Sequence, residues 1–315
     1  MFTLEPLIQA AADRQIRLHA VMVVKDDELL GAHRFSDERF YNVYSVTKSF
    51  TATAIGMGID EGLLSLSDRP VDVFADLLPD TADPRWEKVT LRNLLTMTTG
   101  HQGAYLMAAD RKFLRGETAD KVDDAVRKEW LLYVFSRPME IEPGTEFHYG
   151  NLGPYVAGRM LERAAGASLR DYLYERLWRP MGTKLPQWET DVSGHTFPAS
   201  GLYLDIEDMT KFGLFCLHGG RYDGKQLVSG EWIELAASRQ VDCHPISRNP
   251  AAEDEKSGYG FSFWMNSRDG YRAYGRESQF VLVLPKKNAV VSIQADHSNV
   301  QQVMDLFWEY IYEQM

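Results

Sequence analysis

The chain has 315 residues, of which 44% are hydrophobic and 25% charged, a composition typical of a folded protein with a large core. Its formal charge of -11 repels phosphate backbones, and no basic stripe with interleaved aromatic residues offsets that charge, so nucleic acid is not an expected partner. The N-terminal residues form neither a cationic nor an apolar signal region, and no later run has the length of a membrane span, so we expect a cytoplasmic protein.

The first part of the chain alternates between helical and extended patterns. The spacing of apolar residues predicts a helix over 4–15, followed by a buried strand at 20–24 and, after an acidic turn, a return strand at 29–33. A long apolar helix should then begin at about Ser45 and end near Gly62, a glycine stop.

Ser45 and Lys48 stand three apart at the start of that helix. Residues at this spacing share one face, so the Lys48 ammonium would lie beside the Ser45 hydroxyl. The hydroxyl would also lie among the unsatisfied N–H groups of the first turn, where the helix dipole favours developing negative charge. This is the geometry of an activated nucleophile. The same two residues also fit a simpler interpretation, in which Ser45 only caps the helix and Lys48 is solvated.

Prolines separate short helical patterns between residues 65 and 200, which predicts a mostly helical region. Its helices are expected over 91–97, 121–136, 152–165 and 169–177. The remaining sequence predicts a helix over 205–218 with Asp205 as its N-cap, followed by a polar loop over 243–258. Four strands should then follow, over 259–265, 271–274, 279–284 and 289–294, and a helix over 300–312 should close the chain.

Strands at both ends of the chain with helices between them predict an α+β fold. We expect an antiparallel sheet that is built from both termini and flanked by helices, with a mostly helical insert. The sheet domain would comprise residues 1–64 and 201–315, and the helical domain residues 65–200. The active site would lie at their interface.

Two cysteines, Cys216 and Cys243, are too few for a disulfide framework, and both are expected to be thiols. His218 and His244 lie close to them in sequence. Cys216 falls in an apolar run, however, and the spacings match no familiar zinc pattern. We therefore expect no metal site and no other cofactor.

About a hundred residues after Lys48, a turn precedes Tyr149 and Asn151. A tyrosine is a poor base at its usual pKa of ~10, but a lysine cation beside it stabilises the phenolate. Ser45 would attack, Tyr149 or Lys48 would take its proton and hand it to the leaving group, and the Asn151 amide would hold a substrate carbonyl or amide. Taken alone, Tyr149 also fits a tyrosine that simply packs beside a helix.

As a set, these motifs resemble the serine β-lactamase-like superfamily. The resemblance covers residues 20–295 and rests on the order of the motifs Ser45-x-x-Lys48, Leu94-Leu95-Thr96-Met97-Thr98-Thr99-Gly100, Pro143-Gly144-Thr145-x-Phe147-x-Tyr149-x-Asn151, Leu177-Trp178-Arg179-Pro180-Met181-Gly182, Ser200-Gly201-Leu202-Tyr203 and Asp208-Met209-x-Lys211-Phe212-Gly213. The chain looks like the class C branch, which includes class C β-lactamases, D-Ala-D-Ala carboxypeptidases, family VIII carboxylesterases and 6-aminohexanoate-dimer hydrolases. The resemblance implies a β-lactamase/transpeptidase-like fold and a serine hydrolase with Ser45, Lys48 and Tyr149 as catalytic residues.

The third motif of this family is Lys or His, then Thr or Ser, then Gly, and the corresponding residues here are Ala273, Tyr274 and Gly275. A glycine at the last position lets a substrate backbone approach closely. In the family the next residue, here Arg276, provides one of two oxyanion N–H groups, which are worth several kcal/mol of barrier. Tyr274, Gly275 and Arg276 therefore join Asn151 as expected substrate-binding residues.

The motif departs from the family at Ala273, where β-lactamases and carboxypeptidases have a cation that binds the substrate carboxylate. Arg272 or Arg276 could supply a guanidinium instead, since Arg pairs bidentately with carboxylates. Alternatively, each is an exposed arginine beside a strand end. The missing cation favours neutral acyl substrates, so we expect a serine hydrolase that acts through an acyl-enzyme on a small ester, amide or peptide-like molecule.

Two other functions stay open on the sequence alone. One is β-lactamase or D-Ala-D-Ala carboxypeptidase-like activity. The other is a non-catalytic, penicillin-binding-type sensor that keeps the pocket to bind a peptide or cell-wall fragment. The loops over 101–120 and 243–258 would set the shape of the pocket, and the sequence does not indicate the oligomeric state.

Overall fold

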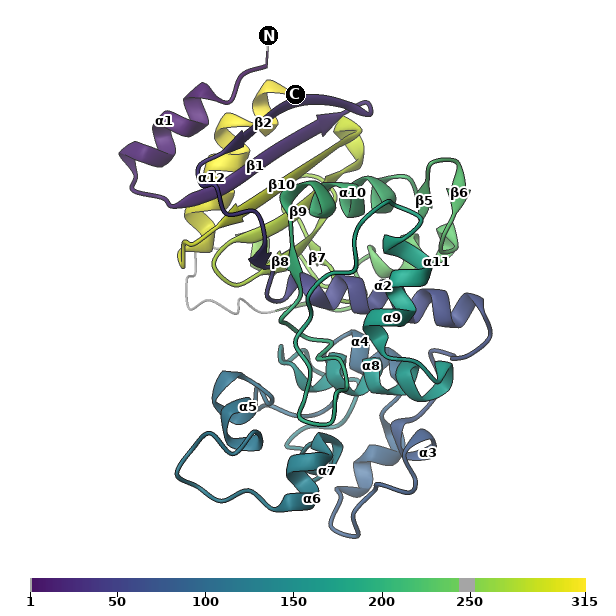
Figure 1. The fold of residues 1–315 in the computed structure, drawn as a ribbon. Helices are drawn as coiled ribbons and strands as arrows, with labels where there is room; N and C mark the ends of the chain where they lie inside the picture. The colour runs from purple at the N-terminus through teal and green to yellow at the C-terminus, as the bar shows by residue number, and fades with distance from the viewer. Residues whose placement is uncertain (1, 244–252) are drawn as a thin grey trace.

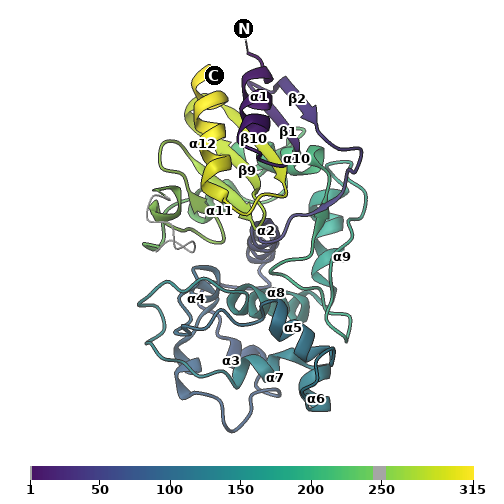
Figure 2. The same cartoon turned by 90° about the vertical axis from the view of Figure 1, so that its left-hand side faces the viewer.

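In the computed structural model, which describes residues 2–243 and 253–315, a sheet and a group of short helices lie on opposite sides of one long helix, α2 (Val46–Asp60) (Figure 1). Figure 2 looks nearly along α2. It shows the sheet above this helix, covered by α1 (Glu5–Asp13) and α12 (Val300–Tyr310), and α3 to α8 below it. Helix α2 is therefore the element that the two parts of the fold share.

The sheet joins strands from the two ends of the chain. Its order is β2-β1-β10-β9-β8-β7, and every pairing is antiparallel, with Val21 opposite Ile293 where the first and last strands meet. Its strands are β1 (Leu18–Lys25), β2 (Glu28–Arg34), β7 (Trp264–Met265), β8 (Tyr271–Gly275), β9 (Gln279–Leu284) and β10 (Ala289–Ala295). The predicted α+β fold, with an antiparallel sheet built from both termini, is confirmed.

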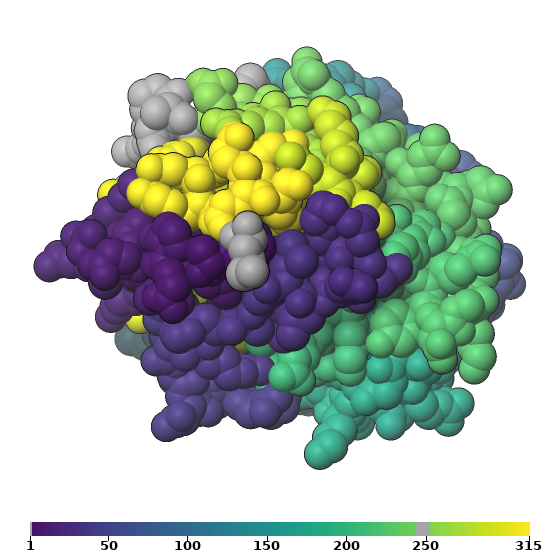
Figure 3. Space-filling model, turned by 90° about the horizontal axis from the view of Figure 1, so that it is seen from above, coloured from purple at the N-terminus to yellow at the C-terminus, as the bar shows by residue number. Residues whose placement is uncertain are grey.

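Side chains of the central strands alternate between two apolar cores. In β9, Phe280 and Leu282 face the core that α1 and α12 cover, whereas Val281 and Val283 face α2 and α10 (Ile206–Leu217). A strand that is buried on both faces shows this alternation because its side chains point to opposite sides in turn. Figure 3 views the molecule from above and shows α1, in purple, and α12, in yellow, side by side on the outer surface.

Short helices make up the region between residues 65 and 200, as the sequence predicted. They are α3 (Pro70–Val73), α4 (Leu91–Leu95), α5 (Ala108–Leu114), α6 (Asp124–Lys128), α7 (Trp130–Phe135), α8 (Leu152–Ala165) and α9 (Leu169–Leu173), which continues as a π-helical turn, Tyr174–Trp178. Helix α8 packs against both α2 and α4. The exact domain boundaries, at residues 64 and 201, stay a prediction.

Smaller elements complete the described chain. The short strand pairs are β3 (Tyr41–Asn42) with β4 (Tyr203–Leu204) and β5 (Arg221–Tyr222) with β6 (Lys225–Gln226), and α11 (Gly230–Ala236) is a further helix. Turns of 3-10 helix occur at Pro84–Lys88, Glu253–Lys256, Pro285–Lys287 and Tyr312–Gln314. Within residues 2–243 and 253–315, none of the helices combines the length and apolar character needed to cross a bilayer.

Two predicted elements were wrong in extent. The single helix expected over 121–136 is split into α6 and α7 because Glu129 leaves the helical conformation, with φ -134° and ψ 97°, and its carboxylate accepts a hydrogen bond from the Leu131 N–H. The strand expected over 259–265 is reduced to Trp264–Met265, since the chain turns at Ser262, whose φ is 61°. Most of the predicted loop over 243–258 lies outside the described residues.

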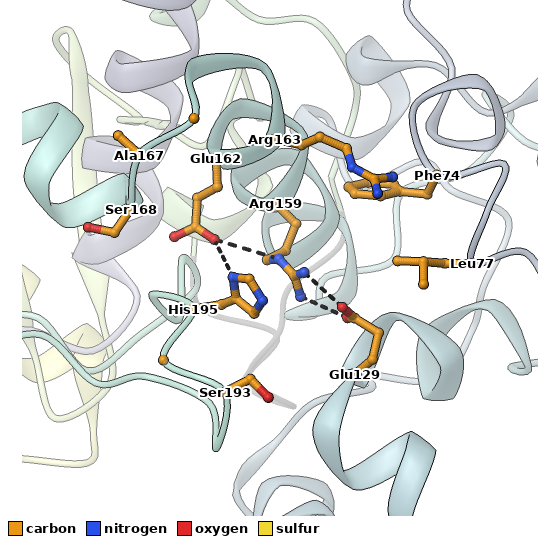
Figure 4. Close-up of a pocket in the computed structure, with 12 residues that line it drawn as sticks. Phe74, Leu77, Glu129, Arg159, Glu162, Arg163, Ala167, Ser168, Ser193 and His195 are labelled. Carbon is orange, nitrogen blue, oxygen red and sulfur yellow. Dashed lines mark hydrogen bonds and ion pairs between the residues drawn. The ribbon is translucent and has the colours of Figure 1, made fainter.

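A buried ionic network lies beside a cavity of about 520 Å³ in the helical region (Figure 4). Arg159 of α8, whose side chain is 6% exposed, makes a bidentate ion pair with Glu129 at 2.8 and 2.9 Å and lies 3.6 Å from Glu162. Glu162 also lies 3.1 Å from the Nδ1 atom of His195. The network therefore joins α8 to the break between α6 and α7 and to the loop that carries His195.

Replacing Arg159 with Met should lower the free energy of unfolding by at least about 3 kcal/mol, because Glu129 and Glu162 would stay buried without their cation. Arg163, one turn further along α8, pairs with Asp76 near the surface at 2.6 Å, and Arg163→Met should cost about 1 kcal/mol or less. Urea unfolding of the two variants measures the difference. Equal losses would contradict a special role for the buried pair.

Candidate active site

Ser45 occupies the N-cap position of α2, but its side chain makes no capping hydrogen bond. The residue before it, Tyr44, has a φ of 46°, a conformation that is uncommon outside glycine and that turns the chain from β3 into the helix. The Ser45 Oγ atom lies 2.8 Å from the Nζ atom of Lys48. Of the two interpretations that the sequence allowed, the structure favours the serine–lysine pair over the simple cap.

Lys48 is fully buried, and its Nζ atom contacts three oxygens from separate parts of the chain. Besides Ser45 Oγ, these are Asn151 Oδ1 at 2.7 Å and the carbonyl oxygen of Ala199 at 2.8 Å. Burial, and then the positive charge of Arg111, lower the pKa of Lys48 well below its usual value. Both causes favour the uncharged amine.

Tyr149 stands beside this pair. Its phenol is hydrogen-bonded to the Ser45 side chain, and the centre of its ring lies 5.0 Å from Lys48 Nζ. Burial raises the pKa of Tyr149 above its usual value, and the hydrogen bond with Ser45 offsets only part of that rise. The structure thus brings together Ser45, Lys48 and Tyr149, the three residues that the sequence singled out as catalytic, with a phenol that holds its proton.

Asn151 is oriented by the carbonyl oxygen of Leu106, which accepts a hydrogen bond from its Nδ2 atom at 3.0 Å. The same nitrogen lies 3.3 Å from the Sδ atom of Met107. Because Leu106 offers only an acceptor, the Asn151 oxygen must face Lys48. The sequence predicted that this amide holds the substrate; in the structure it holds the lysine.

The end of β8 lies against the backbone of Ser45. A Cβ atom added to Gly275 would lie 2.2 Å from the carbonyl oxygen of Val43 and 3.1 Å from the Ser45 nitrogen. Only glycine fits such an approach. The side chain of Arg276, the next residue, is 76% exposed and pairs with Glu277 at 2.9 Å. The predicted third motif therefore lies against the backbone of Ser45 through Gly275.

Arg272 does not replace the missing cation. Its side chain is 1% exposed, and its guanidinium donates hydrogen bonds to the carbonyl oxygens of Met265 at 2.7 Å and Asp254 at 3.0 Å. Neighbouring strand residues point to opposite faces, so Arg272 projects away from the face of β8 that carries Ala273 and Gly275. The expectation of an exposed arginine holds for Arg276 and was wrong for Arg272.

Aromatic rings surround Tyr149. The ring centre of Trp264 lies 5.4 Å from that of Tyr149 and 4.9 Å from that of Tyr259. The ring of Tyr274 contacts Trp264, with 6.2 Å between the ring centres, and stacks on Phe280 at 5.2 Å. Tyr274 was expected to bind substrate, and the structure places it within this aromatic cluster. Tyr259 and Trp264 were not expected beside Tyr149, because the run over 259–265 was interpreted as a strand.

Both cysteines are buried free thiols. The Cys243 Sγ atom donates to the carbonyl oxygen of Glu255 at 3.0 Å, and burial raises the pKa of Cys216. Across the two described ranges, 2–243 and 253–315, no three His, Cys, Asp or Glu side chains are grouped so as to hold a metal ion.

A family model described as Beta-lactamase matches residues 4–305. The chain belongs to the beta-lactamase family. Among its relatives in this family, a lovastatin esterase from Penicillium rubens is 29% identical over 150 residues, which are 44% of this chain and 37% of the esterase. The 6-aminohexanoate-dimer hydrolase of Paenarthrobacter ureafaciens is 23% identical over 282 residues, 86% of this chain and 71% of the hydrolase.

The fold of this beta-lactamase family member is also found among solved structures. A penicillin-binding protein homologue from Pyrococcus abyssi superposes with a TM-score of 0.72 at 22% identity, covering 98% of this chain and 76% of that one. The resemblance inferred from the motifs is thus confirmed at the level of family and fold. The chain spans little more than a third of the lovastatin esterase that it matches.

The pH dependence of stability should report the lowered pKa of Lys48. An unfolded chain keeps a proton on Lys48 up to pH ~10.4, whereas the folded chain loses it at the lowered pKa. Stability should therefore rise with pH between these two values, by up to about 1.4 kcal/mol per pH unit.

Lys48→Met lacks this contribution, so its free energy of unfolding relative to the native chain should fall as pH rises from about 7 to about 9.5. Urea unfolding at several pH values provides the measurement, with the exposed Lys225→Met as control. A difference between Lys48→Met and the native chain that does not change with pH would contradict the buried neutral amine.

Proposed function

We propose that this chain is a serine hydrolase that forms an acyl-enzyme at Ser45 and releases the acyl group to water. The observation that carries the proposal is the set of groups around Lys48 Nζ. A neutral amine has two N–H donors and one lone pair. Asn151 Oδ1 and the Ala199 carbonyl can only accept, so they take the two N–H groups, and the lone pair faces the Ser45 hydroxyl. Lys48 is then placed to act as a general base.

In the proposed reaction, Ser45 Oγ bonds to the substrate carbonyl carbon while its proton passes to Lys48 Nζ. The carbonyl oxygen becomes an oxyanion, which the backbone N–H groups of Ser45 and Arg276 would stabilise. The bond to the leaving group then breaks, and that group takes a proton from Tyr149, which Lys48 replenishes. Water then attacks the acyl-enzyme. Its proton passes to Tyr149, which passes one on to Lys48, and Lys48 returns a proton to Ser45 Oγ as the acyl group leaves. Lys48 and Tyr149 act as a coupled pair, so a pH profile would report values that belong to both.

A small neutral ester or amide is the substrate class that the site supports best. Ala273 carries no charge, Arg272 is turned away, and Arg276 is paired with Glu277 at the surface. Among the described residues of the third motif, a substrate carboxylate would therefore meet no cation that is free of other partners, while the aromatic cluster beside Tyr149 suits an apolar group. The names of the two relatives, a lovastatin esterase and a 6-aminohexanoate-dimer hydrolase, agree with hydrolysis of an ester or amide bond, but not with a preference for neutral substrates, because an aminohexanoate dimer ends in a carboxylate. The position of the site between two domains and the cytoplasmic location stay predictions.

Ser45→Ala should abolish turnover of a short-chain p-nitrophenyl ester, with a loss of at least about 10³-fold in kcat. It should also abolish the acyl adduct that mass spectrometry detects on the native protein. Ser49→Ala removes another buried serine of the same helix, one whose hydroxyl bonds to the Ser262 carbonyl oxygen at 2.6 Å, and should keep the adduct. An adduct that persists in Ser45→Ala would rule out this nucleophile, and faster turnover of nitrocefin than of the ester would contradict the preference for neutral substrates.

Gly275→Ala should lower kcat/KM for the same ester by at least about 10²-fold, because its Cβ would collide with the Val43 carbonyl and shift the strand end that carries the Arg276 N–H. The matched control is Gly230→Ala, since a Cβ there meets its nearest atom at an ordinary 3.6 Å. Circular dichroism and thermal unfolding establish that both variants are folded. Near-native activity of a folded Gly275→Ala would show that this contact does not shape the site.

A further inference from the structure

Arg111 lies behind the serine–lysine pair and has no part in the reaction as described so far. It belongs to α5, its side chain is 14% exposed, and its guanidinium carbon lies 4.5 Å above the ring of Phe197. Its Nη1 atom donates to the carbonyl oxygen of Leu106 at 3.2 Å, and the same oxygen accepts from Asn151 Nδ2 at 3.0 Å. One carbonyl and one amide therefore connect Arg111 to Lys48.

A second path joins the same two residues through the segment 197–201. The Phe197 ring lies under Arg111, and the Ala199 carbonyl accepts from Lys48 Nζ at 2.8 Å. Gly201 is packed tightly against Glu189, and the carboxylate of Glu189 lies 3.4 Å from Arg111 Nε. Arg111 and Lys48 are thus held by the same short segment of backbone.

The charges around this contact leave a positive potential at the lysine. Within the described part of the chain, the groups in contact with Lys48 Nζ are uncharged: a hydroxyl, an amide, a carbonyl and the Tyr149 ring. Glu189 is shared between Arg111 and Arg115, so it compensates Arg111 only in part. Asp110, the other carboxylate near Arg111, already accepts from Met107 N and the Tyr133 hydroxyl.

We infer that Arg111 is a positioning residue that acts on Ser45 through Lys48, an inference that rests on the proposed function. Its charge adds to the effect of burial in favouring the uncharged form of the neighbouring amine, and its bond to Leu106 helps to fix the Asn151 amide that holds this amine. A nearby like charge disfavours the charged form of a group, and the low dielectric of a buried site strengthens the effect. Lys48 would then be available as the base for Ser45 at a lower pH than in a protein that lacks the Arg111 charge.

The test is the pH profile of kcat/KM for a short-chain p-nitrophenyl ester, whose acid limb reports the base of the free enzyme. Removing the charge in Arg111→Met should raise the pKa of Lys48 and move the acid limb upward by about half a pH unit or more, with the high-pH plateau kept within about threefold. Arg111→Lys should restore most of the native profile. Lys112→Met, an exposed cation on the same helix, should leave the profile unchanged.

Glu189→Gln provides a test of sign. It removes the partial compensation of Arg111, so the acid limb should move to lower pH. A purely structural role of Arg111 would not produce opposite shifts in Arg111→Met and Glu189→Gln. An unmoved limb in Arg111→Met, or a loss at all pH values that Arg111→Lys does not restore, would overturn the inference.

A direct titration separates this inference from the proposed function. In protein labelled with 13C at the lysine ε carbons, the Lys48 signal is the one that Lys48→Arg removes, and its NMR titration does not depend on turnover. If the native protein hydrolyses no ester, the proposed function fails, while a higher pKa of Lys48 in Arg111→Met would still support the inference. An unchanged Lys48 titration would overturn it even in an active enzyme.

Discussion

A lysine amine taken out of water must either lose its charge or be compensated, because an isolated buried cation costs several kcal/mol. In this protein Lys48 meets that constraint with three neutral oxygens that come from the start of α2, the start of α8 and the segment before β4. These parts are far apart in sequence, so the central helix, α8 and the segment before β4 must all be in place before the amine has its partners. The rest of the site is arranged around this one atom.

Helix α2 makes such an arrangement possible because it is buried on every side. Its residues from Val46 to Gly58 are all buried, so it has no solvent-facing stripe and lies between the sheet and the helical region as a fixed support. A reactive serine at the end of a packed helix keeps its orientation without help from a mobile loop. The close approach of Gly275 adds a second rigid element, so that the proposed nucleophile, Ser45, and the expected oxyanion donors are held by helix and strand backbone.

The parts of the site that could be predicted are those that local spacing or a family motif encodes. The serine and lysine share a helix face by virtue of three-residue spacing, and the hairpin of β1 and β2 follows from two short apolar runs. Arg272 shows the limit: its sequence position suggested an exposed strand end, but strand register turned it inward to bond with backbone carbonyls.

Residues whose role depends on tertiary neighbours left no signal in the sequence. Arg111 lies in a stretch with no clear periodicity, and only the folded chain brings it against Leu106 and Phe197. Likewise the break between α6 and α7 could not be foreseen, because Glu129 leaves the helix to meet Arg159 from a distant helix. In both cases a charge in a buried place determines the local structure more strongly than the intrinsic preference of its own segment.

The pairing of β1 with β10 has a consequence for how the protein is made. Val21 must wait for Ile293, which the ribosome adds long afterwards, so β1 stays without this partner until β10 has been made. Gly275 and Arg276 emerge in the same late stretch. A growing chain therefore carries its serine and lysine long before it carries the backbone against which they work. The candidate site is completed only when β8 and the residue after it have been made.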